Sequence, residues 1–317
     1  MSLRARLIGF GSYLPKQIVT NADLAERIDT SDEWIRTRTG IAQRHVAGDG
    51  ETAVSMAVES ARAALDYANT SADDVGAVIV ATATPDQSFP ATAVRVQAAL
   101  GMTGGFAFDL TAACSGFVYA LATAEAFIRS GQVRKALVIG TEVYSRIVDW
   151  EDRTTCVLFG DGAGAVLLEA TEEEGYGILS THLHSDGNYG DILFVDGPAT
   201  PRPVLHMQGR EVFRHAVAKL SSVVDEALAA NGFQPQDIAW LVPHQANLRI
   251  IEGMAKKLAL PLDRVVITVD RHANTSAASI PLALDEAVRD GRIKPGDLVL
   301  LEALGGGLTW GSALLRL

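Results

Sequence analysis

Cys114 is the residue of this chain whose type and position most directly suggest covalent chemistry. It lies in the stretch AACSGFVYALATAEAFIRSG, directly before apolar residues that recur at helical spacing. Unpaired N–H groups at a helix N-terminus favour a thiolate and can lower a cysteine pKa to about 3.5–7.5. The stretch alone nevertheless favours the other interpretation, a buried core cysteine. Cys156, the second cysteine, lies in an apolar strand pattern and is interpreted only as core.

Three later segments carry groups that could assist a nucleophile. His244 follows a predicted buried strand, Asn274 lies in a polar turn before a helix, and glycines occupy 305–307. The N–H groups of such glycines could bind an oxyanion. All three follow the carboxyl ends of predicted strands, where open α/β sheets carry ligand sites. Each also has an ordinary interpretation: a loop histidine, a helix-capping cluster, or a tight turn.

The elements that must position these groups alternate between strands and helices. Strands are predicted at 3–10, 76–83, 136–142, 156–169, 177–184, 239–243, 264–268, 298–304 and 310–316. Helices are predicted at 21–28, 31–38, 51–68, 90–100, 114–130, 209–231, 247–259 and 276–290. The alternation indicates layered α/β structure with a largely parallel sheet.

The chain also has a two-fold rhythm. The stretches DDVGAVIVATATPD (73–86) and QDIAWLVPHQAN (236–247) each lead from an acidic turn into a short buried strand and a polar loop. They predict two similar halves, 1–172 and 173–317, divided near TEEEG at 171–175. The same charged turn could instead be a solvated loop within one domain.

Composition limits the classes of function. A net charge of −11 argues against bulk nucleic-acid binding, and the apolar runs are too short to span a membrane. The N-terminus has no signal-peptide pattern and there are two cysteines among 317 residues. We therefore expect a cytoplasmic protein in a reducing compartment, with neither nucleic acid nor membrane as a partner.

Taken in order, the motifs resemble those of the β-ketoacyl-acyl carrier protein synthase III family of the thiolase superfamily. The resemblance covers nearly the whole chain and is carried by GFGSYLP, TSDEWIRTRTGI, AACSGF, FGDGAGA, DGNYG, VPHQANLRII, NTSAASIP and GGGLTWGSALLR. It implies a thiolase-like α/β fold in an αβαβα arrangement and a homodimer. It also implies a CoA thioester as substrate, without a metal or a permanently bound cofactor.

The resemblance further implies a Cys-His-Asn site formed by Cys114, His244 and Asn274. A short acyl-CoA, such as acetyl-CoA, would acylate Cys114, and malonyl-acyl carrier protein would then lose carbon dioxide and attack the acyl group. The N–H groups of Cys114 and Gly306 would form the oxyanion hole. His244 would need its hydrogen on Nε2 to donate a bond to the thioester oxygen.

Binding residues are implied in the same way. Those for CoA are Thr30, Trp34, Arg38, Arg153, Met207, Phe213, Ala246, Asn247 and Arg249, with Trp34 and Arg153 stacking on adenine. Those for acyl carrier protein are Arg214, Gln245, Ala246, Asn247, Leu248, Arg249, Lys256 and Lys257. Phe89 would close the acyl pocket across the dimer interface.

The chain departs from the family pattern at four positions. Ala273 replaces a common glycine, Leu304 and Leu308 replace phenylalanines, and Thr154 replaces a glycine beside Arg153. A degradative thiolase would carry a second reactive cysteine near the glycine triplet, and an elongating synthase would carry histidine at 274. An acyl-CoA-primed ketosynthase of secondary metabolism, a Cys-His-Asn hydrolase and a non-catalytic acyl-binding homologue remain as alternatives.

Overall fold

Two mixed sheets form the frame of the molecule, which is described from a computed structural model covering residues 3–197 and 199–317. The first sheet has the order β1-β7-β6-β4-β5 and the second the order β11-β12-β13-β8. The strands of the first are β1 (Arg4–Tyr13), β4 (Ala77–Ala81), β5 (Phe106–Leu110), β6 (Lys135–Val143) and β7 (Asp161–Thr171). Those of the second are β8 (Gly177–Ser185), β11 (Trp240–Pro243), β12 (Leu298–Gly305) and β13 (Thr309–Arg316).

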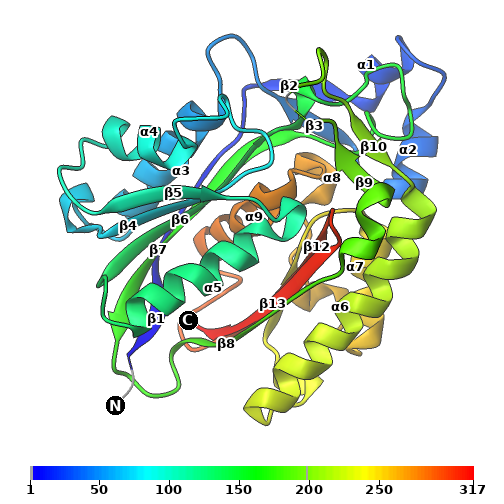
Figure 1. The fold of residues 1–317 in the computed structure, drawn as a ribbon. Helices are drawn as coiled ribbons and strands as arrows, with labels where there is room; N and C mark the ends of the chain where they lie inside the picture. The colour runs from blue at the N-terminus through cyan, green and yellow to red at the C-terminus, as the bar shows by residue number, and fades with distance from the viewer. Residues whose placement is uncertain (1–2, 198) are drawn as a thin grey trace.

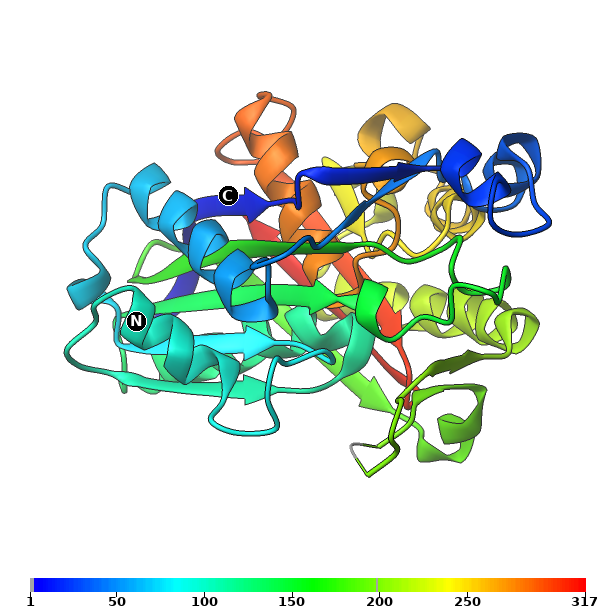
Figure 2. The same ribbon diagram turned by 90° about the horizontal axis from the view of Figure 1, so that it is seen from above.

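Helices cover both sheets and fill the space between them. They are α1 (Asn21–Ala25), α2 (Asp32–Thr39), α3 (Ala53–Tyr67), α4 (Thr92–Ala99), α5 (Gly116–Arg129), α6 (Gly209–Asn231), α7 (Leu248–Lys257), α8 (Val269–His272) and α9 (Ser279–Arg289). Figures 1 and 2 show α3 and α4 on one side of the molecule, α6 and α7 on the opposite side, and α5 and α9 between. The predicted five-layer αβαβα fold is confirmed.

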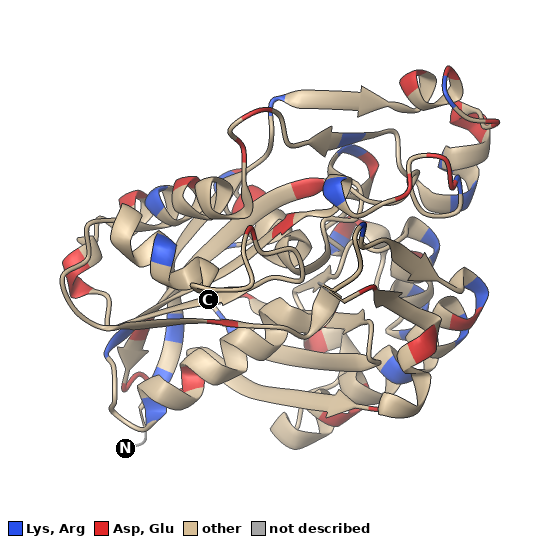
Figure 3. Cartoon of the chain, turned by 45° about the horizontal axis from the view of Figure 1, so that its top comes forward, with Lys and Arg blue, Asp and Glu red and all other residues tan. Residues whose placement is uncertain are grey.

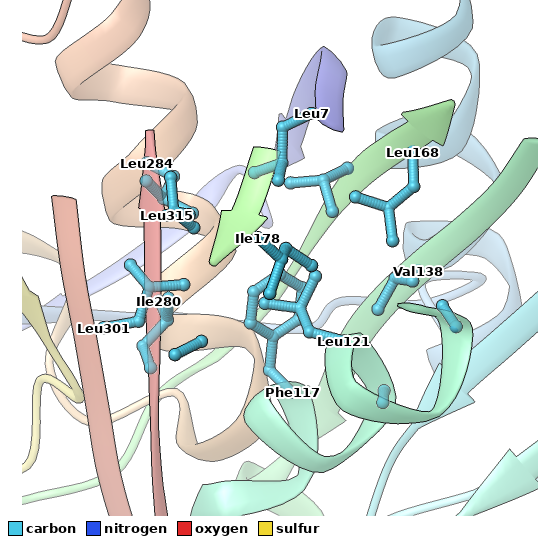
Figure 4. Packing of buried hydrophobic residues seen from close by; sticks show 14 of the residues in the cluster. Leu7, Phe117, Leu121, Val138, Leu168, Ile178, Ile280, Leu284, Leu301 and Leu315 are labelled. Carbon is cyan, nitrogen blue, oxygen red and sulfur yellow. The ribbon is translucent and has the colours of Figure 1, made fainter. Parts of the chain in front are cut away.

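The central helices are buried because both of their faces contact a sheet. α5 packs against β6 and β13, and α9 packs against β7 and β11. Figure 4 shows one apolar cluster in which Phe117 and Leu121 of α5 lie among side chains from both sheets, including Val138 and Leu315. Burial on both faces explains why α5 carries almost no charge.

The prediction of largely parallel sheets is wrong. β4 pairs in parallel with β5 and β6, and β11 with β12, but the remaining neighbours in both sheets are antiparallel. A short turn after Gly305 joins β12 directly to β13, which forces that pair to be antiparallel. Figure 2 shows these strands side by side.

Smaller differences lie at particular segments. Residues 156–160 precede β7 in turns, where Cys156 N–H donates to the Asp152 carbonyl at 3.0 Å. The predicted strand at 264–268 makes only one bridge, between Val265 and Leu241. The edge strand β5 was not predicted. Neither were α8 nor the short pairs β2 (Gln17–Thr20) with β3 (Gln43–Val46) and β9 (Leu193–Val195) with β10 (Leu205–Met207).

The first sheet ends at Thr171 and the second begins at Gly177. The predicted halves, 1–172 and 173–317, would therefore each contain one complete sheet. Because α9, from the second half, packs against β1 and β7 of the first, the two halves share a core. We keep the two-half division as a proposal about the architecture.

Candidate active site

Cys114 lies at the junction between β5 and α5, in the short 3-10 turn η2 (Ala113–Ser115). Only 6% of the residue is exposed. Burial raises the pKa of the thiol to about 12, and the Ser276 hydroxyl opposes this by hydrogen bonding. The expected lowering by the helix N-terminus is thus outweighed by desolvation, which favours the neutral thiol in the unliganded protein.

His244 directly follows β11 and is held from two sides. Its N–H donates to the Glu302 carbonyl at 2.8 Å, and its Nδ1 lies 2.7 Å from Ser279 Oγ. Ser279 Oγ also accepts the Gln245 N–H at 3.3 Å, so its own hydrogen can be donated to Nδ1. Burial lowers the pKa of His244 to about 3, which keeps the ring neutral. This arrangement favours the tautomer with hydrogen on Nε2.

Asn274 is fixed by its backbone and by its side chain. Its N–H donates to Leu158 O at 2.9 Å, and its carbonyl accepts the Gly160 N–H at 3.0 Å. The side-chain Oδ1 accepts the Ser276 N–H at 2.9 Å. Because Oδ1 is used within the protein, the Nδ2 hydrogens are the ones that can be offered to a ligand.

The turn that carries Cys114 packs against segments that lie next to Asn274 and His244. η2 contacts both the end of β12 and the turn η7 (Ser276–Ala278), which follows Asn274. Gly305 lies so close that a Cβ on it would stand 2.6 Å from Cys114 N. Gly305 therefore must be glycine, a role that sequence reasoning did not assign.

Backbone strain is concentrated at the same place. Ala113, Ala273 and Ser276 all have positive φ, at +46°, +58° and +49°. For Ala273, ψ is −160°, a combination almost confined to glycine. This explains why the family commonly has glycine there. Strained residues beside Cys114 and Asn274 are typical of a functional site.

Gly306, the predicted second oxyanion donor, follows directly after Gly305. A Cβ on Gly306 would stand 2.6 Å from the carbonyl oxygen of Leu193, so this position also excludes side chains. The departures Leu304 and Leu308 are buried in the cluster that packs under α6 and α7. Their effect is thus on packing around the glycine turn.

The residues predicted to bind adenine form a stack on the surface. The guanidinium of Arg38 lies 4.5 Å from the centroid of the Trp34 ring, and that of Arg153 lies 5.2 Å from it. Arg153 is also bonded to the backbone carbonyl of Asp29 at 2.8 Å. A planar base entering between Trp34 and Arg153 would have to move the arginine outward.

Most of the other predicted CoA residues lie along the start of α6 and α7, and Thr30 lies just before α2. Asn247 caps α7 and donates from Nδ2 to the Arg38 carbonyl at 3.1 Å, which joins this helix to α2. The Arg249 guanidinium lies 5.8 Å from the Phe213 ring. Met207, Ala246 and Thr30 are half-buried, and the Thr30 hydroxyl is buried without a hydrogen-bond partner.

The predicted carrier-protein contacts divide into accessible and inaccessible positions. Gln245 does not fit, because it is fully buried and its side chain bonds to Pro243 O, Val266 O and the N–H groups of 268 and 269. Its amide instead fixes the loop that carries His244. Arg249, Lys256 and Lys257 are exposed, and Lys257 is also paired with Asp225 at 3.1 Å.

Arg214 is exposed and paired with Glu211 at 2.5 Å, and Leu248 is half-buried beside Gly40. Figure 3 shows basic and acidic positions interspersed over the chain.

Phe89, the predicted acyl-pocket residue, is 85% exposed. Among residues 3–197 and 199–317, no group of three or more metal-ligating side chains could hold an ion, and no helix has the length and hydropathy to cross a bilayer.

Comparisons with known proteins show the family of the chain. Family models described as the 3-oxoacyl-[acyl-carrier-protein] synthase III domain and its C-terminal domain match residues 108–187 and 228–317. The chain is 70% identical to β-ketoacyl-[acyl-carrier-protein] synthase III of Acidiphilium cryptum, over 99% of both chains.

Two solved structures extend the comparison. 3-Oxoacyl-[acyl-carrier-protein] synthase III from Aquifex aeolicus superposes with a TM-score of 0.95 at 48% identity, covering 99% of this chain and all of the other. The priming β-ketosynthase from the R1128 polyketide pathway has a TM-score of 0.93 at 37% identity, covering 99% and 97%. With its thiolase-type fold and these relatives, the chain belongs to the β-ketoacyl-acyl carrier protein synthase III family of condensing acyltransferases.

Proposed function

We propose that the protein condenses a short acyl-CoA, preferably acetyl-CoA, with malonyl-acyl carrier protein, and so initiates fatty acid synthesis. The observation that carries this proposal is that the turn of the buried Cys114 packs against the turn that follows Asn274 and against β12, whose Glu302 carbonyl holds His244. Such a site suits a reaction that transfers an acyl group and then stabilises an enolate.

In the first step, Cys114 Sγ attacks the thioester carbonyl and CoA leaves. The oxyanion is stabilised by the N–H groups of Cys114 and Gly306. In the second step, malonyl-acyl carrier protein loses carbon dioxide. The thioester oxygen of the resulting enolate accepts bonds from His244 Nε2–H and Asn274 Nδ2–H. The carbanion then attacks the acyl group on Cys114 to give the β-ketoacyl product.

Asn274→Ala separates these two steps. The variant should keep acylation of Cys114 while condensation falls by about 10²–10³-fold, the usual cost of an oxyanion donor. Acylation is followed by intact-protein mass spectrometry with acetyl-CoA, and condensation by formation of acetoacetyl-acyl carrier protein. Loss of acylation with normal decarboxylation would contradict these assignments.

CoA would enter between the Trp34–Arg153 stack and the start of α7, with its phosphates near Arg38 and Arg249. Its pantetheine would run past Thr30, Met207, Phe213, Ala246 and Asn247 to Cys114. Phe89 would be covered by a second subunit and close the acyl pocket, which favours a short primer. Turnover with acyl-CoA substrates of increasing length distinguishes this role from a priming synthase that uses longer or branched primers.

Acyl carrier protein would dock on the basic residues at the mouth of the site, in a cytoplasmic enzyme. Arg249→Glu should raise the KM for malonyl-acyl carrier protein more than that for a carrier-free malonyl thioester without the CoA nucleotide, because charge complementarity acts on the carrier protein. Lys257→Glu is the matched control and should have less effect, because Lys257 is already paired with Asp225. Equal losses with both malonyl substrates would contradict docking at Arg249.

A further inference from the structure

Two hydroxyl side chains join the turn that carries Cys114 to the turn that carries Gly306. Ser115 follows Cys114 directly and is fully buried, and Thr309 is the first residue of β13. Their hydroxyl oxygens lie 2.7 Å apart. The proposed condensation steps give neither hydroxyl a role, although the two turns supply the two N–H groups of the proposed oxyanion hole.

The two hydroxyls also contact a backbone carbonyl of each turn. Ser115 Oγ lies 2.7 Å from Ala112 O, and Thr309 Oγ1 lies 2.9 Å from the same carbonyl oxygen. Thr309 Oγ1 also lies 3.2 Å from Gly306 O. Thr309 therefore bridges the carbonyl two residues before Cys114 and the carbonyl of Gly306.

The hydrogens of the two hydroxyls are sufficient for these contacts. Each hydroxyl has one hydrogen and two lone pairs. When Ser115 donates to Thr309, the Thr309 hydrogen faces both Ala112 O and Gly306 O, and such shared bonds are common at helix termini. Thr309 is thus the residue whose hydrogen reaches both turns, and Ser115 orients that hydrogen by occupying a lone pair of Thr309.

The glycine turn, residues 306–308, is fixed from two sides. On one side, Leu308 and Asp186 exchange two backbone hydrogen bonds of 2.8 and 3.0 Å. On the side of Cys114, the hydrogen bonds that join residues 112–116 to residues 305–309, all of them described, are those made by Thr309. Gly306 and Gly307 have no side chains with which to fix their own backbone, so the turn depends on these external bonds.

Close packing alone would not fix the two turns in register. A Cβ on Gly305 would stand 2.6 Å from Cys114 N and 3.0 Å from Ser115 N, so the backbones are already in contact. Van der Waals contact has little directionality, whereas a hydrogen bond weakens steeply as its angle closes. The Thr309 and Ser115 hydroxyls therefore add a fixed orientation to a contact that packing brings close.

We propose that Thr309, oriented by Ser115, sets the position of Gly306 relative to Cys114 and so holds the oxyanion hole in the geometry that acyl transfer requires. The inference rests on the proposed function for the two N–H groups, those of Cys114 and Gly306, that would bind the oxyanion. In this role Thr309 acts through the backbone and is a positioning residue. A displacement of about 1 Å in such a site can lower the rate by about 10²-fold.

Thr309→Val tests this role because it removes the hydroxyl and keeps the shape of the side chain. p-Nitrophenyl acetate acylates a cysteine through a tetrahedral oxyanion and contains no CoA. Peptide mass spectrometry follows the appearance of the acetyl group on Cys114, and the variant should be acylated about 10–100-fold more slowly than the wild type. With acetyl-CoA, the maximal acylation rate should fall by a similar factor, while the half-saturating concentration stays within about twofold.

Iodoacetamide separates positioning of the oxyanion hole from damage to the thiol. Alkylation displaces iodide at a saturated carbon, so it uses the same sulfur but forms no oxyanion. Cys114 of Thr309→Val should therefore be alkylated within about threefold of the wild-type rate. A loss of alkylation as large as the loss of acylation would overturn the inference, because the hydroxyl would then act on the thiol or on access to it.

Two further variants test whether the hydroxyl is the cause. Thr309→Ser and Thr309→Ala both lack the methyl group and differ from each other only in the hydroxyl, so only Thr309→Ala should show the slow acylation. Ser312→Ala is the matched control, since Ser312 is fully buried on the same strand and its hydroxyl donates to Val223 O at 3.2 Å. It should be acylated within about twofold of the wild-type rate.

Equal losses in Thr309→Ser and Thr309→Ala, or a comparable loss in Ser312→Ala, would overturn the role of the hydroxyl. If Thr309→Val fails to fold, as judged by thermal melting, Thr309→Ser and Thr309→Ala decide the matter in its place. Failure of the proposed function gives a different result. In that case acetyl-CoA would leave wild-type Cys114 unmodified, while p-nitrophenyl acetate would still acylate it more slowly in Thr309→Val than in the wild type.

Discussion

The two cysteines of this chain are both buried and both hold their protons tightly, yet their surroundings differ. Burial raises the pKa of Cys114 to about 12 and that of Cys156 to about 11. Cys156 packs in an apolar cluster with side chains such as Val157 and Leu220. Arg44, a charged neighbour of Cys156, donates its hydrogen bonds to the Val19 and Val157 carbonyls and to Asn21 Oδ1.

The turn that carries Cys114, in contrast, packs against β12 and against the turn that follows Asn274, which come from distant parts of the chain. His244, Asn274 and Ser276 all lie in the second half, more than 120 residues away. The pKa values of the two thiols are too close to rank their reactivity. We assign reactivity to Cys114 from the groups proposed to stabilise an oxyanion beside it.

The largest expected effect comes from replacing each cysteine in turn, which tests whether the two differ in reactivity. Cys114→Ser should lower the rate of CoA release from acetyl-CoA at least about 10³-fold, because a neutral hydroxyl is a poorer nucleophile. Cys156→Ser should leave the rate within about threefold, since it removes no group of the site. A stopped-flow thiol assay for CoA measures both, and a comparable loss in Cys156→Ser would contradict the distinction.

A second test concerns the cost of burying polar groups beside Cys114. Glu302 holds His244 through its backbone, and its carboxyl is buried with Oε2 unpaired, so burial raises its pKa to about 8. The folded state keeps the proton that the unfolded state loses above pH 4.5. The free energy of unfolding is therefore not reduced by Glu302 below pH 4.5, and it falls as the pH rises from 4.5 to 8.

Glu302→Gln removes this loss because an amide does not ionise. Its free energy of unfolding should match that of the wild type near pH 4.5 and exceed it at pH 8.5 by on the order of 3–5 kcal/mol. Urea unfolding at the two pH values measures the difference. An advantage for the variant that is equal at both pH values would show that ionisation is not the cause.

The smallest expected effect concerns the strained backbone of Ala273, directly before Asn274. Ala273→Gly should relieve the glycine-type conformation before Asn274, but it also loses a buried methyl group and adds unfolded-state entropy. We expect a net change within about 1 kcal/mol. Ala259, with φ of +50° at the exposed end of α7, provides the control, and Ala259→Gly should stabilise by up to about 1 kcal/mol.

A loss of more than about 2 kcal/mol in Ala273→Gly, together with the expected gain in Ala259→Gly, would contradict strain at Ala273. Thermal melting of both variants against the wild type makes the measurement.

The sequence predicted the helices well because their apolar spacing is a local property. It missed β5, a short edge strand whose residues are all half-buried, and it mistook the pairing of the sheets, which depends on distant partners. Gln245 was predicted from the resemblance to contact acyl carrier protein, although its side chain is enclosed by the loop at 266–269.

The site residues Cys114, His244 and Asn274 were predicted from the resemblance of the whole ordered set of motifs. What the sequence could not show is the protonation of each group. The high pKa of Cys114 and the low pKa of His244 arise from desolvation by elements that meet only in the folded chain. Ser276 and Ser279 were present in the quoted motif NTSAASIP, but their partners became visible only in the structure.

The most direct test of the account is to locate the acyl group on the wild-type protein. After incubation with isotopically labelled acetyl-CoA and rapid acid quenching, peptide mass spectrometry should find one acetyl group, on the peptide that contains Cys114. Malonyl-acyl carrier protein added before the quench should remove it and yield labelled acetoacetyl-acyl carrier protein. An acetyl group on Cys156, or an unmodified Cys114 in protein that still binds CoA, would contradict the account.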